Sequence, residues 1–154
     1  MDLAKVLEIA EQANEFIDNM RQKANRIINK INKCLDDLEN LISNAAIHSA
    51  QYIKEKTKLI SDKINNMVKE FEDAVQRFKD RIKDWYNSQV NYVKFNIVKV
   101  QQSKLGVNIP DDQIKLLANA VPHPELSIPD FKIVVPDVSS IGDGTTSFSR
   151  VPNL

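Results

Sequence analysis

Glycine, cysteine and long apolar runs are scarce in this sequence of 154 residues, which holds three glycines and one cysteine. A single cysteine excludes an internal disulfide framework and any metal site built from several cysteines. No apolar run reaches the roughly 18 residues that indicate a transmembrane helix. The first residues, MDLAKVLEIAEQANEF, carry acidic side chains where a signal peptide would need a basic segment followed by an apolar one. We therefore expect neither a transmembrane segment nor a signal peptide.

The sequence also lacks an excess of charge of either sign, because 21 basic side chains balance 21 acidic ones. No net field directs the protein toward nucleic acid or a membrane surface, and we expect no specific contact with either. The histidines His48 and His123 have no second histidine or cysteine at the spacing of a zinc site. Cys34 falls within an apolar stripe, where a core residue is more typical than a nucleophile. Without a phosphate loop or a catalytic serine motif, the chain is expected to be no enzyme and to use no cofactor, metal or small-molecule substrate.

Proline and glycine are absent before Gly106, and apolar residues repeat there at helical spacing. In the first part of the chain they occupy the a and d positions of successive heptads, which predicts an amphipathic coiled-coil helix. The Lys104-Leu105-Gly106 sequence predicts the end of the helical region, because glycine readily takes the left-handed conformation that ends helices. The a and d residues are Leu3, Val6, Ala10, Ala13, Ile17, Met20, Ala24, Ile27, Ile31, Cys34, Leu38, Leu41 and Ala45.

A second apolar run in a shifted register follows, and it contains aromatic residues seven positions apart: Phe71, Phe78, Trp85 and Tyr92. Packing in a helical core is the ordinary explanation of such a line. The alternative is a ridge that binds a partner, since buried Trp and Tyr dominate many interfaces. Trp85 and Tyr92 are therefore candidate partner-binding residues of the helical region.

The register changes at residues 43–50, so the chain either folds back there or continues as one helix. Folding back would place the acids of residues 36–39 opposite the lysines of residues 54–58. Such surface pairs set orientation more than stability, being worth less than about 1 kcal/mol each. We favour an antiparallel hairpin. A continuous rod that dimerises antiparallel satisfies the same charges and stays open as the alternative, because the junction lacks glycine and proline.

The composition changes after Gly106. Residues 106–121 are expected to hold one short helix, since Pro110 and two aspartates suit its first turn. Repeated prolines then exclude sustained helix from residues 122–154, which we call the arm. Within the arm, residues 131–135 (FKIVV) are a strand candidate and residues 142–144 (Gly-Asp-Gly) a turn candidate. The predicted fold is mainly α: a long helical hairpin or coiled-coil stem over 1–105, the short helix over 106–121 and the extended arm.

The arm has regularly spaced apolar residues but too little material for a core of its own. Segments of this kind are disordered unless another surface holds them. Whether the arm docks on its own chain or on another protein is left open by the sequence. Its candidate partner-binding residues are Ile128, Phe131, Ile133, Val135, Val138, Phe148, Val151 and Leu154.

In architecture the chain resembles small virion structural proteins of tailed bacteriophages. The resemblance lies in the helical stem over 3–104, the proline-spaced arm from VPHPELSIPDFKIVVPDV onward, and the richness in Ile, Asn and Lys. It implies a spacer, clamp or adaptor in a tail, baseplate or head, located in the virion. Its partners would be other protein subunits of a large assembly, with possible self-association.

Two other functions fit the same pattern. A helical chaperone or secretion-type binding module would shield an apolar segment of another protein. An amphipathic lipid-surface binder would open its apolar stripe onto a membrane, although the balanced charge disfavours this. For a chain not encoded by a phage, the expected location is the cytoplasm.

Overall fold

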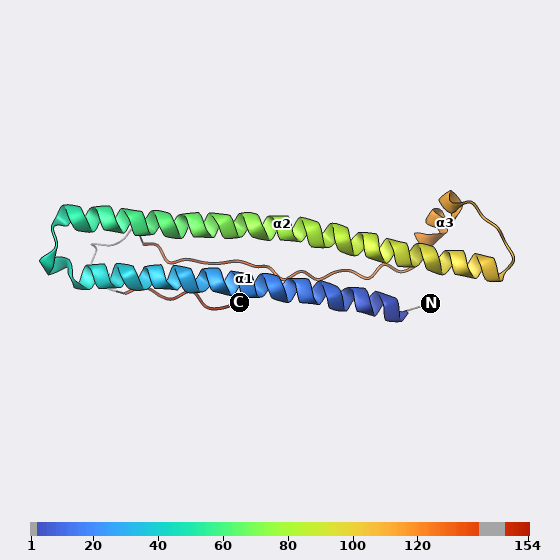
Figure 1. Cartoon of the computed structure of the whole chain (residues 1–154), viewed down its shortest axis with the longest axis horizontal. Coiled ribbons are helices and arrows are strands. Elements are labelled where there is room, and N and C mark those ends of the chain that lie inside the picture. The colour runs from blue at the N-terminus through green and yellow to red at the C-terminus, as the bar shows by residue number, and fades with distance from the viewer. Residues whose placement is uncertain (1–2, 139–146) are drawn as a thin grey trace. The chain divides into compact units, whose positions relative to one another are not determined.

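The computed structural model describes residues 3–138 and 147–154. Within them it has the helices α1 (Leu3–Ser43), α2 (Ala50–Lys104) and α3 (Asp111–Ala118), and a single 3-10 turn at Ala45–Ile47, as Figure 1 shows. The predicted mainly α class and the helical hairpin are confirmed. No strand occurs among the described residues, so the strand predicted at 131–135 is wrong. The turn predicted at 142–144 lies outside the described residues.

The chain forms two compact units, and the predicted stem is divided between them. The first unit combines residues 1–18 with 77–129, and the second combines residues 19–76 with 130–154. Each unit therefore contains part of α1 and part of α2, together with a piece of the later chain.

In the second unit, the chain reverses direction between Ser43 and Ala50. The backbone N–H and the side-chain amide of Asn44 both donate to the carbonyl oxygen of Asn40 at the end of α1, at 3.1 Å and 2.9 Å. Ser49 is the N-cap of α2, because its hydroxyl accepts the Tyr52 backbone N–H at 3.1 Å. These local bonds end one helix and start the next without glycine or proline. The hairpin is thus confirmed over the continuous rod.

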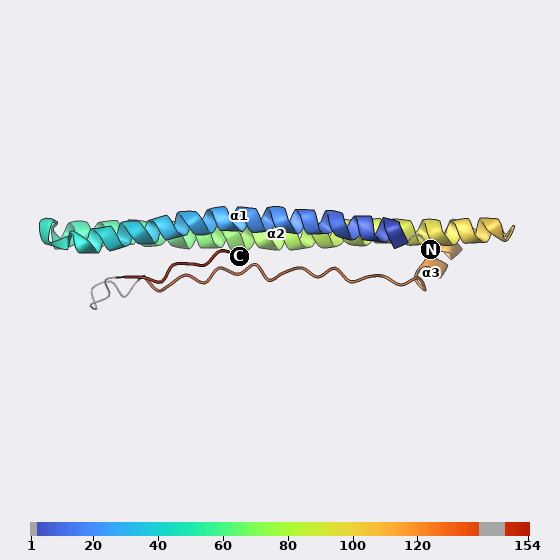
Figure 2. The same ribbon diagram turned by 90° about the horizontal axis from the view of Figure 1, so that it is seen from below.

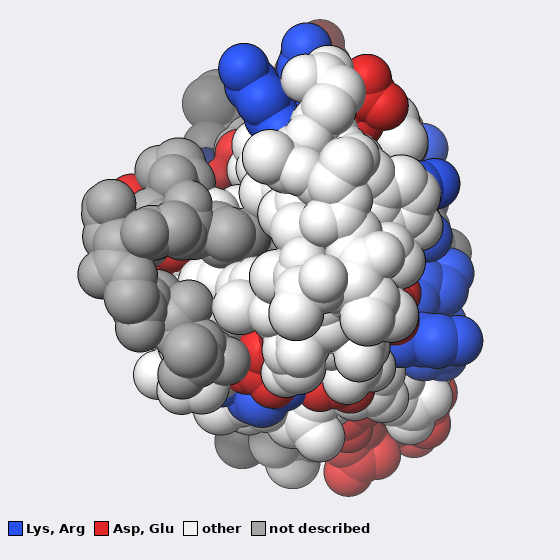
Figure 3. Space-filling view, turned by 90° about the vertical axis from the view of Figure 1, so that its left-hand side faces the viewer, with Lys and Arg blue, Asp and Glu red and all other residues white. Residues whose placement is uncertain are grey.

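The surface of this turn is uncharged. No Asp, Glu, Lys or Arg occurs between Glu39 and Lys54, and Figure 3 shows the resulting uncharged face. Ile47 at the turn is 77% exposed, and the rings of His48 and Tyr52 stack with centroids 4.5 Å apart.

The core of the second unit consists of the heptad stripe of α1 and the facing side of α2. Ile31, Leu38 and Ile64 are fully buried, and Cys34 lies among them at 4% exposure. Burial raises the pKa of the Cys34 thiol, which agrees with the predicted role of a core residue. Two stretches of the arm, residues 130–138 and 147–154, run along this hairpin in extended form (Figure 2).

Burial along α2 repeats every eleven residues, not every seven. At about 100° per residue, an eleven-residue repeat runs about 20° past three full turns and a seven-residue repeat falls about 20° short of two, so the drift per residue is smaller for the repeat of eleven. The predicted aromatic line therefore rotates out of the core, from Phe71 at 1% exposure to Tyr92 at 67%. The buried residues eleven apart are Ile64, Val75 and Tyr86 in one series, and Phe71, Ile82 and Val93 in the other.

In the first unit, α3 packs against the end of α2. Ile114 and Ala118 are buried with Val98, and Phe95, Ile109 and Val121 pack around them. The chain turns between the helices at Gly106, whose φ is +71°, as its predicted role requires. The Val107 N–H donates to the carbonyl oxygen of Gln102 at 3.0 Å, a bond typical of a glycine-terminated helix.

Candidate functional site

Three polar side chains on α1 bind the backbone of the arm. Asn25, Asn32 and Glu39 are each seven residues apart, so they lie on one face of the helix. We call them the α1 ladder. Their partners, Leu154, Val151 and Phe148, are each three residues apart and run in the opposite direction. All six residues belong to the second unit.

Each asparagine of the ladder makes two hydrogen bonds with one residue of the arm. Asn32 donates from Nδ2 to the Val151 carbonyl oxygen at 2.9 Å and accepts the Val151 N–H at 2.8 Å. Asn25 makes the same pair of bonds with Leu154, at 3.3 Å and 2.8 Å. An amide can do this because it carries both a donor and an acceptor. The two asparagines therefore bind peptide backbone without reading side chains.

The spacing of the two partners makes the repeat possible. Seven helical residues advance about 10.5 Å, at roughly 1.5 Å per residue. Three extended residues advance about 9.3 to 10.2 Å, at about 3.1 to 3.4 Å per residue. A helix can thus offer one polar side chain per heptad to every third residue of an extended segment.

Glu39 is the charged end of the ladder. Its Oε1 accepts the Phe148 N–H at 2.8 Å, and both of its oxygens accept bonds from Arg150, at 2.9 Å and 2.7 Å. The Arg150 guanidinium also donates from Nε to Asp36 at 3.0 Å. The sequence predicted that these acids face the lysines of residues 54–58; Arg150 of the arm binds two of them instead. Hydrogen bonds from Arg150 and then from the Phe148 N–H lower the pKa of Glu39.

Acidification is expected to loosen the arm at Glu39. Because the pKa of Glu39 is below its ordinary value of 4.5 in the folded chain, its contribution is complete above pH 4.5 and is lost as the pH falls through the lower folded value. The measurement is amide hydrogen exchange at Val151 and Phe148 as a function of pH, corrected for intrinsic rates. Glu39→Gln keeps an acceptor for Phe148 but should flatten this acid step. An acid step of equal size in the variant would contradict the assignment.

The structure places the predicted arm residues on the chain's own helices. In the second unit, Phe131, Ile133, Val138 and Val151 are buried. Phe148 and Val135 are half-buried there, and Leu154 is 38% exposed. Ile128 belongs to the first unit and is half-buried. The arm is thus held by its own chain, and of the predicted set only Phe148, Val151 and Leu154 meet the ladder. Their binding of a partner stays a prediction.

The two predicted aromatic residues of the helical region differ in environment. Trp85 packs edge-on against Phe16 of α1, with ring centroids 5.2 Å apart and an interplanar angle of 87°. Tyr92 is 67% exposed. Trp85 thus contributes to the packing of the first unit, while Tyr92 remains accessible.

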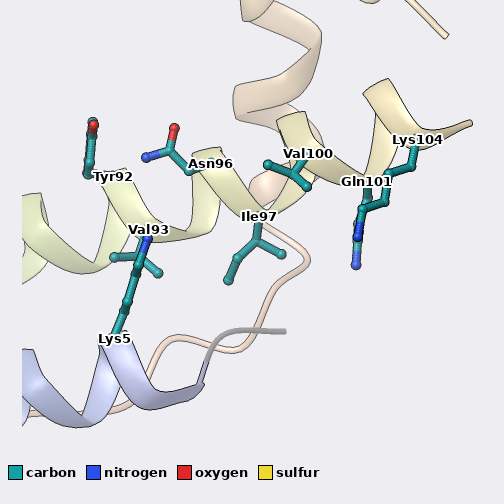
Figure 4. A pocket seen from close by; sticks show the side chains of 8 residues that line it. All are labelled: Lys5, Tyr92, Val93, Asn96, Ile97, Val100, Gln101 and Lys104. Carbon is teal, nitrogen blue, oxygen red and sulfur yellow. The ribbon is translucent and has the colours of Figure 1, made fainter. Parts of the chain in front are cut away.

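Tyr92 lines a groove in the first unit with a volume of about 370 Å³. Figure 4 shows Lys5 extending from α1 toward Val93, while Gln101 and Lys104 extend from the last turns of α2. The lining combines apolar and basic side chains with amides and contains no acid. The lining residues are Lys5, Tyr92, Val93, Asn96, Ile97, Val100, Gln101 and Lys104.

A separate set of polar contacts holds the start of the arm to α2 in the first unit. The Tyr86 hydroxyl donates to the Pro124 carbonyl oxygen at 2.8 Å, and His123 Nε2 bonds Asn87 Oδ1 at 3.0 Å. Burial raises the pKa of Tyr86. His123 thus serves packing here, and no cluster of potential metal ligands occurs among residues 3–138 and 147–154.

Tyr86→Phe is expected to lower the free energy of unfolding by about 1 kcal/mol, the typical net value of one hydrogen bond. Urea denaturation followed by circular dichroism measures it. Tyr52→Phe is the matched control, because Tyr52 is 40% exposed and its hydroxyl can stay hydrated. Equal effects of the two substitutions would contradict the role given to the Pro124 bond.

Sequence reasoning missed the ladder although its signal is present. Asn25, Asn32 and Glu39 share heptad position b, next to the buried a position. Phe148, Val151 and Leu154 show a matching period of three. The two periods become meaningful only when the arm is known to lie along α1.

The fold and the ladder define a class: an all-α helical hairpin protein that binds an extended segment along its first helix. Residues 3–115, from the start of α1 into α3, match the family model of the Tht1-like nuclear fusion protein. The chain therefore belongs to the Tht1-like nuclear fusion protein family. No curated protein and no solved structure matches it.

This family membership corrects the predicted function. A nuclear fusion family points away from a phage, so the resemblance to phage virion proteins and the virion location are wrong. The spacer, clamp or adaptor in a virion, the helical chaperone or secretion-type module and the lipid-surface binder are likewise not supported. The error came from architecture, since long helical hairpins with extended tails serve many functions. In the described part of the chain, no helix is long and apolar enough to cross a membrane.

Proposed function

We propose that this protein takes part in the fusion of nuclei, in a non-catalytic role exerted through contacts with other proteins. The family match supports this, because it includes all of α1 and α2 and so the whole helical hairpin. Helical hairpins act in assemblies by presenting long side-chain surfaces, and such a role needs no catalytic residue. The family match is the observation on which the proposal rests.

The groove around Tyr92 is the proposed contact surface of the first unit. Its apolar residues Val93 and Ile97 lie among Lys5 and Lys104, and it has no acidic lining residue. Such a groove suits a partner segment that combines apolar and acidic side chains. Tyr92 supplies the large exposed aromatic ring that commonly anchors an interface.

Loss of the gene in the cells that produce the protein tests the role. Nuclei that meet should then fail to fuse, and the wild-type gene should restore fusion. Asn29→Asp, an exposed substitution on α1, should restore it equally well, whereas Ile31→Asp, in the buried stripe, should not. Normal nuclear fusion without the gene would refute the proposal.

The groove has its own test in the same assay. Tyr92→Ala is expected to reduce nuclear fusion without lowering the helical signal or the melting temperature, because the side chain is 67% exposed. Leu116→Ala is the matched control, since Leu116 is 70% exposed on α3 and does not line the groove. Equal activity of the two variants would remove the groove from the proposal while leaving the family role intact.

A further inference from the structure

We propose that the α1 ladder is a binding site for an extended segment of another protein, and that the chain's own residues 148–154 occupy it in this structure. The ligand is a peptide with apolar side chains at every third position and an arginine just before the second of them. This pattern is that of Phe148-Ser149-Arg150-Val151-Pro152-Asn153-Leu154. The inference goes beyond the proposed role in nuclear fusion and does not depend on it.

The bonds of the two ladder asparagines go to peptide backbone, which every protein segment possesses. Asn32 binds the N–H and the carbonyl oxygen of one residue, and Asn25 does the same three residues later. Both asparagines are half-buried, so their amides are held against the segment. Any extended chain of the right spacing can form these four bonds.

Selectivity comes from the side chains of the bound segment. Val151 is buried at 5% exposure, so the site takes an apolar side chain at this position. Arg150 binds both Asp36 and Glu39, which selects a basic residue immediately before it. Pro152 follows Val151 without penalty, because the ladder takes no N–H from that position.

Occupation by the chain's own arm regulates the site. A segment that binds in cis reduces the apparent affinity for an outside ligand by the fraction of molecules whose site is free. Weakening the arm should therefore strengthen binding of a peptide supplied in trans. Arg150→Glu is suited to this purpose, because the residue is exposed and the new carboxylate would face Asp36 and Glu39.

The experiment measures binding of a fluorescent peptide, SFSRVPNL, to the full chain by anisotropy. The Kd for the Arg150→Glu chain is expected to be at least tenfold lower than for the wild-type chain. Adding Asn32→Leu or Asn25→Leu to Arg150→Glu should raise the Kd at least tenfold again, with helical circular dichroism unchanged. Two ladder variants are used so that a folding defect in one does not decide the result.

Chemically altered peptides test backbone recognition directly. N-methylation at the valine of the peptide removes the N–H that Asn32 accepts, and should abolish binding to the Arg150→Glu chain. N-methylation at the serine after phenylalanine lies outside the three positions that the ladder binds and should change the Kd by less than threefold. Equal tolerance of both modifications would overturn the proposal, as would failure of the unmodified peptide to bind the Arg150→Glu chain.

A second copy of this chain is the competing occupant. If arms exchange between copies, the wild-type chain will form dimers that increase with concentration and that Asn32→Leu dissociates. Sedimentation velocity distinguishes this result from a monomer. Such dimers would assign the site to self-association and overturn the proposal of a foreign ligand, whereas a monomer that binds the peptide after Arg150→Glu supports it.

Discussion

Ile31→Asp is expected to unfold the second unit at temperatures where the wild-type chain stays folded. Ile31 is fully buried between neighbours of the α1 stripe and lies in the same core as Ile64 of α2. An unpaired carboxylate there costs several kcal/mol or forces its own protonation. That loss is comparable with the roughly 5 to 15 kcal/mol that stabilises a typical domain. Thermal and urea melts followed by circular dichroism measure the effect.

Asn29→Asp is the matched control for this substitution. It introduces the same carboxylate two residues away on the same helix, but at an exposed position. Exposed substitutions usually change the free energy of unfolding by no more than about 0.5 kcal/mol. Similar melts for the two variants would mean that the α1 stripe is not a buried seam.

Phe71→Ala is expected to lower the free energy of unfolding by about 3 to 5 kcal/mol, the usual cost of deleting a buried phenylalanine ring. The ring of Phe71 is 1% exposed on α2. Truncation removes its burial and leaves a cavity that the surrounding side chains fill only in part. The urea midpoint should fall strongly, while the slope of the transition stays near the wild-type value.

Tyr92→Ala provides the comparison, because Tyr92 belongs to the same line of aromatic residues seven apart. At 67% exposure it should lower the free energy of unfolding by less than about 1 kcal/mol. The sequence alone assigned both residues to one helix face. Equal losses for the two variants would support that seven-residue face and contradict the eleven-residue burial pattern of α2.

The α1 helix and the hairpin were predictable because local signals agree with the packing. A continuous heptad stripe needs a partner, and the nearest one in sequence is the next helix. The uncharged junction and the Ser49 N-cap then allow the chain to reverse. The core of α2 was less predictable, because its burial follows a period of eleven while its aromatic residues follow a period of seven. Sequence reasoning chose the more visible period.

The site was less accessible to sequence reasoning than the fold. Phe148, Val151 and Leu154 were identified as a spaced apolar set, but their partners on α1 were not. An asparagine on the outer part of an amphipathic helix ordinarily indicates a solvated face. Its role as a backbone receptor depends on a contact between residues more than 100 positions apart, such as Asn32 with Val151. No local pattern contains that information.

The pairing of a helix with an extended chain also limits how long the site can be. From one ladder residue to the next, α1 advances about 10.5 Å, whereas the bound segment advances only about 9.3 to 10.2 Å. Hydrogen-bond lengths tolerate only a few tenths of an ångström. The difference between the two spacings adds up with each further pair of residues, so distant pairs can no longer bond. In the two asparagine pairs the backbone N–H bonds are both 2.8 Å, whereas the bond from Nδ2 is 2.9 Å at Val151 and 3.3 Å at Leu154. A longer ligand would have to bend or leave the helix, so recognition is confined to a motif of about seven residues.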